Sequence, residues 1–257
     1  MELRLKIGNQ WYQWDFDKGI DLSISLKNDG RNPAAWYVDA PEIQAVRQGD
    51  FIGKVSEGGS TNFNWIRFNP HAHMTHTECL GHITEEFYSI NSQLKEFHFP
   101  SYLITVAPKE VDGDLIIDLA QLKARLSDRK EMQYAKALLI RTLPNDASKI
   151  SRNYEHSNPP YFSREAMEFI VGLGIEHLLV DLPSVDKEKD GGALVNHNIF
   201  WQTQSEESRK HATITEFIYV NEEIHDGFYL LDLAVAPIEN DASPSRPVIY
   251  QLDKIDL

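Results

Sequence analysis

Four of the ten histidines fall within residues 69–83, a segment that reads NPHAHMTHTECLGHI. Its candidate metal ligands are His71, His73, His76, Glu78 and His82. Neutral imidazole and carboxylate are the usual ligands of a borderline divalent ion such as zinc, and they also suit manganese. His76 and Glu78 are two residues apart, so in an extended segment both side chains point to the same side and can reach one ion. The spacing therefore predicts a divalent metal site.

Two later segments offer further ligands, which a metal site normally draws from several parts of a chain. His197 follows a Gly-Gly turn, and Glu216 lies in the apolar run 214–220. An unpaired carboxylate is costly to bury there, and a nearby cation removes that cost. The competing interpretation places the histidines on a surface loop and Glu216 on an edge strand that faces solvent. We favour the metal site, and we expect no ligand role for His98, His156, His177, His211 and His225.

Cys79 is the only cysteine, so no intrachain disulfide can form, and a disulfide-stapled secreted scaffold is excluded. Its position beside Glu78 invites interpretation as a nucleophile. In an extended segment, however, Cys79 points away from Glu78, and free cysteines are often simply buried. We therefore expect Cys79 to have no catalytic role.

The 257 residues include 25 basic and 39 acidic side chains, for a formal net charge of −14. This balance argues against nucleic-acid binding, which requires a basic face, and no polybasic cluster suits an anionic membrane surface. No apolar run approaches the roughly 20 residues of a membrane span, and the N-terminus has no signal-peptide pattern. We expect a cytoplasmic protein that acts on a small molecule and has no nucleic-acid or membrane partner.

Short runs rich in Ile, Val, Leu, Tyr and Phe, bounded by Gly, Pro, Asn and Asp, recur along the chain. They predict strands at residues 3–7, 20–26, 102–106, 115–117, 137–141, 177–181, 213–220, 229–235 and 248–252. Apolar periodicity predicts helices at 119–130 and 163–173, with a short surface helix at 204–210. Residues 137–181 read strand, loop, helix, strand, which indicates a βαβ unit with parallel pairing. We predict one α/β domain, residues 1–257, with a mixed sheet.

The histidine segment also resembles a family motif. Residues 74–82, Met-Thr-His-Thr-Glu-Cys-Leu-Gly-His, match the pattern His-x-Gly-Thr-His-x-Asp-x-Pro-x-His from its third position onward. That pattern belongs to the cyclase family of metal-dependent hydrolases, which includes bacterial kynurenine formamidase. Further segments resemble motifs of this family in the same order, namely residues 20–23, 139–142, 179–186, 214–217 and 241–246. The ordered set is what carries the resemblance.

Three motif positions depart from the family pattern: its glycine, aspartate and proline are here Met74, Glu78 and Leu80. The family's first histidine falls on Ala72, which is flanked by His71 and His73. A one-residue bulge would bring either histidine into place. We prefer His71, because it follows Pro70, which holds the chain extended, and we keep His73 as the alternative.

The resemblance implies a swivelling β/β/α fold, assembled as a homodimer or a higher homo-oligomer. It implies one or two zinc ions, or manganese, held by His71, His76, Glu78, His197 and Glu216. It also implies that His82 is the general base and acid beside the metal in hydrolysis of a C–N bond by activated water. The expected substrate is a small formamide or amide, with N-formylkynurenine of tryptophan catabolism as a candidate.

Two features leave alternatives open. The aromatic residues Trp36, Tyr37, Phe63, Trp65 and Phe68 either line an aromatic pocket or pack in a core or dimer interface. The irregular stretch 28–63 has the length of a functional lid or an oligomer arm. The alternative function is a catalytically impaired metal- or ligand-binding homologue of the same fold. Retention of His82 favours an enzyme, because binding alone does not require a free base there.

Overall fold

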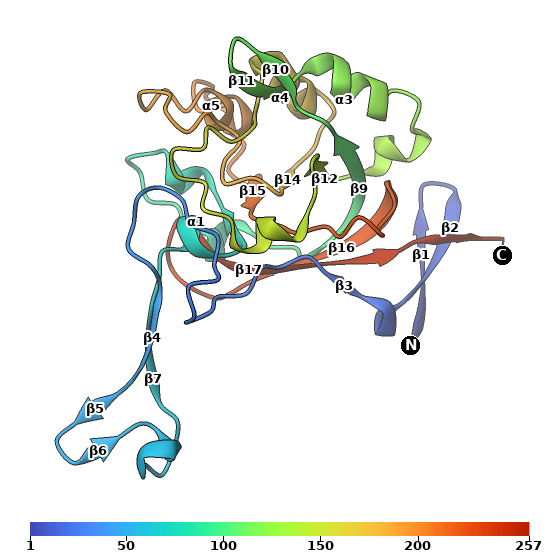
Figure 1. The fold of residues 1–257 in the computed structure, drawn as a ribbon. Helices are drawn as coiled ribbons and strands as arrows, with labels where there is room; N and C mark the ends of the chain where they lie inside the picture. Colours follow the sequence, from blue (N-terminus) through green and yellow to red (C-terminus); the bar gives the residue numbers. More distant parts are fainter. Residues whose placement is uncertain (257) are drawn as a thin grey trace.

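The computed structural model describes residues 1–256, and at its centre a mixed β-sheet closes on itself (Figure 1). The strand order is β16-β9-β12-β14-β15-β8-β17-β3, and an additional β16–β17 pairing closes seven of these strands into a barrel. The strands are β3 (Ile20–Asp21), β8 (His76–Glu78), β9 (His98–Val106), β12 (Ala137–Thr142), β14 (His177–Val180), β15 (Thr213–Glu216), β16 (Gly227–Val235) and β17 (Ala242–Gln251). The predicted α/β fold with a mixed sheet is confirmed.

The parallel strands β9, β12, β14 and β15 form the buried half of this sheet. All six residues of β12 are buried, as expected for a parallel strand that is covered on both faces. Three helices cover the outer face, α3 (Leu119–Leu126), α4 (Arg164–Gly172) and α5 (Val195–Trp201) (Figure 1). Because α4 connects two parallel neighbours, β12 and β14, the predicted βαβ unit is confirmed.

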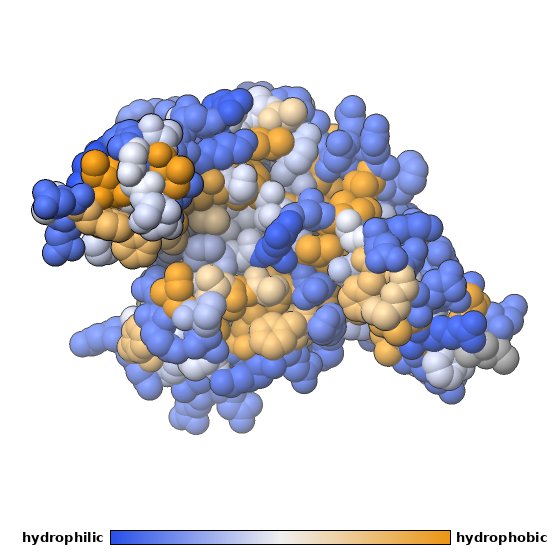
Figure 2. Space-filling model, turned by 90° about the horizontal axis from the view of Figure 1, so that it is seen from below, coloured by the Kyte–Doolittle hydropathy of each residue, from blue (hydrophilic) through white to orange (hydrophobic). Residues whose placement is uncertain are grey.

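Smaller elements surround the barrel. β1 (Glu2–Ile7), β2 (Gln10–Asp15) and β18 (Asp253–Ile255) form a three-stranded sheet that joins the two ends of the described chain. β10 (Lys109–Val111), β11 (Asp114–Ile117) and β13 (Tyr161–Phe162) form another. Seen from below, apolar side chains gather in patches among polar ones (Figure 2). No helix among residues 1–256 is long and apolar enough to cross a bilayer.

An arm projects from the body within the predicted irregular stretch (Figure 1). Its stem is an antiparallel ribbon of β4 (Glu42–Ala45) and β7 (Asn64–Arg67), and its tip carries β5 (Arg47–Gln48) and β6 (Phe51–Ile52). Consecutive strand residues point to opposite faces, and both Trp65 and Ile66 are exposed. Both faces of the ribbon therefore lie free of the body.

Several element predictions are wrong in detail. The strand expected at 20–26 ends at Asp21, whose carboxylate accepts hydrogen bonds from the backbone and hydroxyl of Ser23 and turns the chain. Helix α3 ends at Leu126 rather than residue 130. Residues 204–210 form turns instead of a helix, because this polar segment has no apolar stripe to bury. The helix in this region is α5, which precedes the segment and buries Phe200 and Trp201.

Candidate metal centre

Strand β8 places His76 and Glu78 on one side, as their spacing predicted. Its neighbour β15 pairs so that Glu216 lies directly opposite His76, and opposed residues share a face of the sheet. His76 Nε2 lies 3.4 Å from Glu216 Oε2 and 4.0 Å from Glu78 Oε2. None of these side chains is more than 3% exposed, so Glu216 does not face solvent.

Helix α1 (Pro70–His73) brings His71 to Glu78. The His71 Nδ1 atom lies 3.1 Å from Glu78 Oε2. The expected extended chain and bulge are wrong: Pro70 is the first residue of a helical turn, a position that suits its fixed φ, and Asn69 caps it. His73 lies outside the cluster, with its Nδ1 accepting a hydrogen bond from the Asn69 backbone at 3.1 Å.

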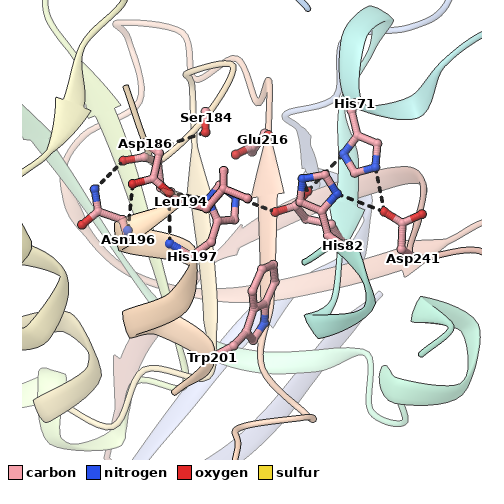
Figure 3. A network of polar contacts seen from close by, with 12 residues as sticks. His71, His82, Ser184, Asp186, Leu194, Asn196, His197, Trp201, Glu216 and Asp241 are labelled. Carbon is pink, nitrogen blue, oxygen red and sulfur yellow. Dashed lines mark hydrogen bonds and ion pairs between the residues drawn. The ribbon is translucent and has the colours of Figure 1, made fainter. Parts of the chain in front are cut away.

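Helix α5 supplies His197, which is buried. Its Nε2 lies 3.1 Å from Glu78 Oε1, and its Nδ1 lies 2.6 Å from Asp186 Oδ2. Asp186 also accepts hydrogen bonds from the backbone of Asn196 and His197, so one carboxylate holds both the start of the helix and the imidazole ring (Figure 3). Asp186 ends the family-like segment 179–186, but its type and spacing predicted no role for it.

His82 approaches the same carboxylate from the turn that follows β8. Its Nε2 lies 3.8 Å from Glu78 Oε2, and its Nδ1 lies 3.1 Å from Asp241 Oδ2. The turn depends on Gly81, where a Cβ atom would lie 2.2 Å from the Tyr88 carbonyl oxygen. Asp241 begins the family-like segment 241–246 and received no role from the sequence. Its approach to two histidines depends on tertiary contacts that no spacing reveals.

The residues at this site fit a divalent cation. Among the described residues, the buried atoms His76 Nε2, Glu78 Oε2 and Glu216 Oε1 have no hydrogen-bond partner. Buried polar atoms are nearly always satisfied, and one bound cation would satisfy all three of these. Sets of imidazole and carboxylate atoms within 4.8 Å of one another include His71–His76–Glu78 and Glu78–His82–His197. This donor set suits zinc or manganese.

The groups of this cluster differ widely in how strongly they hold a proton. Burial opposes protonation of His71 and His197, but contacts with Asp241, Asp186 and Glu78 outweigh burial and raise both pKa values to about 10. Burial and the nearby His71 charge lower the pKa of His76 to about 3. Burial and the neighbouring Glu78 raise the pKa of Glu216 well above its ordinary value. Without a metal, the cluster therefore holds protons that a cation would displace.

A cavity of about 350 Å³ opens beside the cluster. Its lining comprises Trp36, Asn69, His71, His82, Ser184, Leu194, His197 and Glu216. Of the five aromatic residues considered from the sequence, only Trp36 lines this cavity, and its indole N–H donates to the His71 carbonyl oxygen at 3.1 Å. Trp65 is exposed on the arm strand β7, and the exposed Phe63 directly precedes that strand, so the five residues do not form one aromatic pocket here.

Cys79 is buried beneath the site, and its thiol donates to the Tyr88 carbonyl oxygen. Burial raises the pKa of the thiol to about 11, so little thiolate exists at neutral pH. This environment agrees with the expectation that Cys79 is not a nucleophile.

The two candidates for the first ligand should respond differently to substitution. Replacing His71 by alanine removes a nitrogen that faces Glu78, so we expect a loss of zinc affinity of at least tenfold. Replacing His73 by alanine should leave zinc affinity within about twofold, because its ring lies outside the cluster. Zinc titration with a chromophoric chelator measures both. Zinc affinity that is retained equally in both variants would mean that this position holds no ligand and that the site is smaller than the family's.

The chain is similar in sequence to known proteins. A family model described as "Putative cyclase" matches residues 20–187, which is more than half of the chain. The chain is 26% identical over 234 residues to kynurenine formamidase of Bacillus anthracis, covering 90% of this chain and 97% of that protein.

Solved structures share the fold. Isatin hydrolase A from Labrenzia aggregata superposes with a TM-score of 0.65 at 14% identity, over 91% of this chain and 93% of that chain. A protein described as a predicted metal-dependent hydrolase from Bacillus stearothermophilus has a TM-score of 0.63 at 14% identity, over 91% and 98%. The cyclase-like architecture expected from the motifs is confirmed.

Proposed function

The chain belongs to the cyclase family, and on this premise we propose that it is a metal-dependent hydrolase that cleaves the C–N bond of a small formamide or amide. The observation that carries the proposal is the cluster of three unsatisfied buried atoms beside a cavity that His82 also lines. A bound cation would give these three atoms a common partner, and the donor set suits one. The cavity beside the cluster offers space for a substrate.

We assign the ligands as His71, His76, Glu78, His197 and Glu216, around one or two zinc ions, with manganese as the alternative. When bound, such an ion lowers the pKa of water to about 7 and polarises a carbonyl group. Asp186 holds the Nδ1 side of His197, which leaves Nε2 directed toward Glu78. A carboxylate behind a ligating imidazole in this way fixes its orientation.

His82 is proposed to move the proton. Its side chain is 29% exposed, against 3% or less for His76 and Glu216, so it can meet both the cluster and a substrate. An imidazole there can take a proton from the attacking water and return it to the leaving amine. Such positioned acid–base catalysis typically contributes about 10²–10⁴-fold.

The favoured substrate is an aryl formamide, with N-formylkynurenine of tryptophan catabolism as the candidate. Trp36 and Leu194 give the cavity two apolar walls, and Ser184 adds a hydroxyl group. Both Trp36 and Leu194 have positive φ values, 65° and 43°, a costly conformation that tends to occur at functional sites. The names of two similar proteins, a kynurenine formamidase and an isatin hydrolase, support amide substrates that bear an aryl ring.

A panel of substrates tests this function. Zinc-loaded protein is incubated with an aryl formamide, an aliphatic formamide, a cyclic aryl amide and a lactone, and the acid products are quantified. We expect the aryl formamide to be hydrolysed fastest, with release of formate. Hydrolysis of none of the four would favour the alternative function, a catalytically impaired metal- or ligand-binding homologue.

Zinc uptake should release protons. At pH 7 the raised pKa values, about 10, keep His71 and His197 protonated in the zinc-free protein, and each must free a nitrogen to bind. We therefore expect at least two protons per protein, since Glu216, whose pKa is also raised, adds to those of His71 and His197, and we expect zinc affinity that rises with pH. Calorimetric titration in two buffers of different ionisation enthalpy measures the number of protons released per zinc-binding event. Proton-neutral binding of zinc would contradict the assignment.

We further propose a cytoplasmic homodimer or higher homo-oligomer that has no nucleic-acid or membrane partner. The arm supports assembly, because an isolated two-stranded ribbon is only marginally stable and this one exposes Phe63, Trp65 and Ile66. Replacing Trp65 and Ile66 together by serine should lower the mass measured by light scattering. An unchanged oligomer would assign assembly to another surface.

A further inference from the structure

A single carboxylate oxygen lies against two histidines of the site. Asp241 Oδ2 is 2.9 Å from His71 Nε2 and 3.1 Å from His82 Nδ1 (Figure 3). The two imidazole rings stack, with centroids 4.3 Å apart and an interplanar angle of 28°. The opposite nitrogen of each ring faces Glu78 Oε2, at 3.1 Å for His71 and 3.8 Å for His82.

The backbone fixes Asp241 independently of its carboxylate. The residue directly precedes β17, and its carbonyl oxygen accepts a hydrogen bond from the Cys79 backbone at 3.0 Å. Cys79 follows Glu78 in the chain, so Asp241 is tied to the strand that carries the central carboxylate. Asp241 is absent from the lining of the cavity, so its side chain acts on a substrate only through its neighbours.

We propose that Asp241 is a positioning residue that sets the tautomer and ring orientation of both His71 and His82. An ionised carboxylate only accepts hydrogen bonds, so each nitrogen facing it must carry a proton. His71 then holds its proton on Nε2 and offers Nδ1 toward the ion, while His82 holds its proton on Nδ1 and offers Nε2 as a base. This inference rests on the proposed function.

The same contact explains how His71 can occupy the site although the family's first histidine falls on Ala72. Helix α1 directs the His71 ring toward the start of β17, where its Nε2 contacts the carboxylate of Asp241. Asp241 contacts one nitrogen of the His71 ring and Glu78 contacts the other, so the ring orientation is fixed. His71 can therefore face the cluster even though it lies one residue before the position of the family's first histidine.

Imidazole NMR of the zinc-loaded protein tests the proposal without reference to turnover. Histidine is labelled with ¹⁵N, and two-bond ¹H–¹⁵N correlations report which nitrogen carries the proton, with signals assigned through His71→Gln and His82→Gln. We expect Nε2–H for His71 and Nδ1–H for His82. Asp241→Ala should convert His82 to a mixture that includes Nε2–H, and Asp241→Asn, which keeps the volume and one acceptor oxygen, should give a smaller change.

Asp232→Ala is the matched control, because Asp232 faces His98 at 4.0 Å on the exposed side of β16 and touches neither ring. It should leave the His71 and His82 signals unchanged. Unaltered His82 signals in both Asp241 variants, or an Nε2–H tautomer of His82 in the parent protein, would overturn the proposal. Loss of one zinc equivalent in Asp241→Asn with unaltered His82 signals would make Asp241 a ligand instead and would equally overturn it.

Kinetics give the second readout. In Asp241→Asn we expect kcat for the aryl formamide to fall about 10–100-fold, the usual effect of removing a carboxylate behind a histidine. KM should stay within about twofold, since Asp241 does not line the cavity. Equal kcat in Asp241→Asn and the parent would overturn the proposal. If the parent protein hydrolyses no substrate, the proposed function fails, and the NMR result still decides the role of Asp241.

Discussion

Replacing His82 by alanine is expected to remove most turnover while leaving zinc in place. The His82 nitrogen that faces the cluster is 3.8 Å from a Glu78 oxygen, whereas the facing nitrogens of His71 and His197 are each 3.1 Å from one. If His82 transfers the proton, kcat should fall about 10²–10⁴-fold, or about 3–5 kcal/mol of transition-state stabilisation. Steady-state kinetics and elemental analysis of the same sample measure both quantities.

The control is His98→Ala, because His98 is exposed and lies on β9 away from the cluster. It should keep both turnover and zinc. Loss of zinc from His82→Ala would make His82 a ligand and move the base elsewhere. An unchanged kcat would refute the proposed proton transfer, and parent protein that binds zinc but turns over nothing would leave only the impaired homologue.

Glu216→Gln should change stability in opposite directions with and without zinc. In the zinc-free protein, burial and Glu78 raise the pKa of Glu216, whereas the unfolded chain releases this proton near the ordinary pKa. A raised carboxyl pKa therefore costs folding free energy at pH 7, and glutamine removes that cost. With zinc bound, the carboxylate is a ligand. Zinc at 100 times its Kd stabilises the parent by about 2.7 kcal/mol, and the variant should lose much of this.

Thermal unfolding of the variant and the parent protein, once with zinc and once with a chelator, measures the stability difference between them in each condition. Glu239→Gln is the matched control, since Glu239 is an exposed carboxylate outside the cluster, and its effect should not depend on zinc. A Glu216→Gln protein that is destabilised equally in both conditions would show that Glu216 has a structural role alone.

The fold was predicted best where a local sequence pattern, such as an apolar run or a helix cap, matches the element that the folded chain forms there. Most of β12 and β14 consists of the apolar runs 137–140 and 178–180, and Ser163 caps α4 as a helix-start signal should. The arm strands escaped prediction because they bury little, so no alternating apolar pattern marks them. α5 was missed because it begins after Leu194 in a left-handed conformation and has no capping side chain.

The sequence indicated which histidines and carboxylates lie together in the cluster, but it did not indicate which residues hold them in place. Imidazole and carboxylate at two-residue spacing identified His76 and Glu78, and the cost of burying Glu216 indicated a cation. The helical turn that carries His71 was mistaken for extended chain, because Pro70 is compatible with either. Asp241 lies 159 residues from His82 in the chain, and only the folded sheet brings the two together. Asp186 lies 11 residues before His197, on an irregular connection to α5 whose path no local pattern predicts.

The central claim is that hydrolysis depends on a metal held by this cluster, and a titration of zinc-free protein tests it most directly. Zinc or manganese is added in steps while formate release from the aryl formamide is recorded. We predict no turnover without metal, then a rate that rises with added metal and breaks sharply at one or two equivalents. Zinc-free protein that hydrolyses the substrate as fast as the loaded protein would contradict the account.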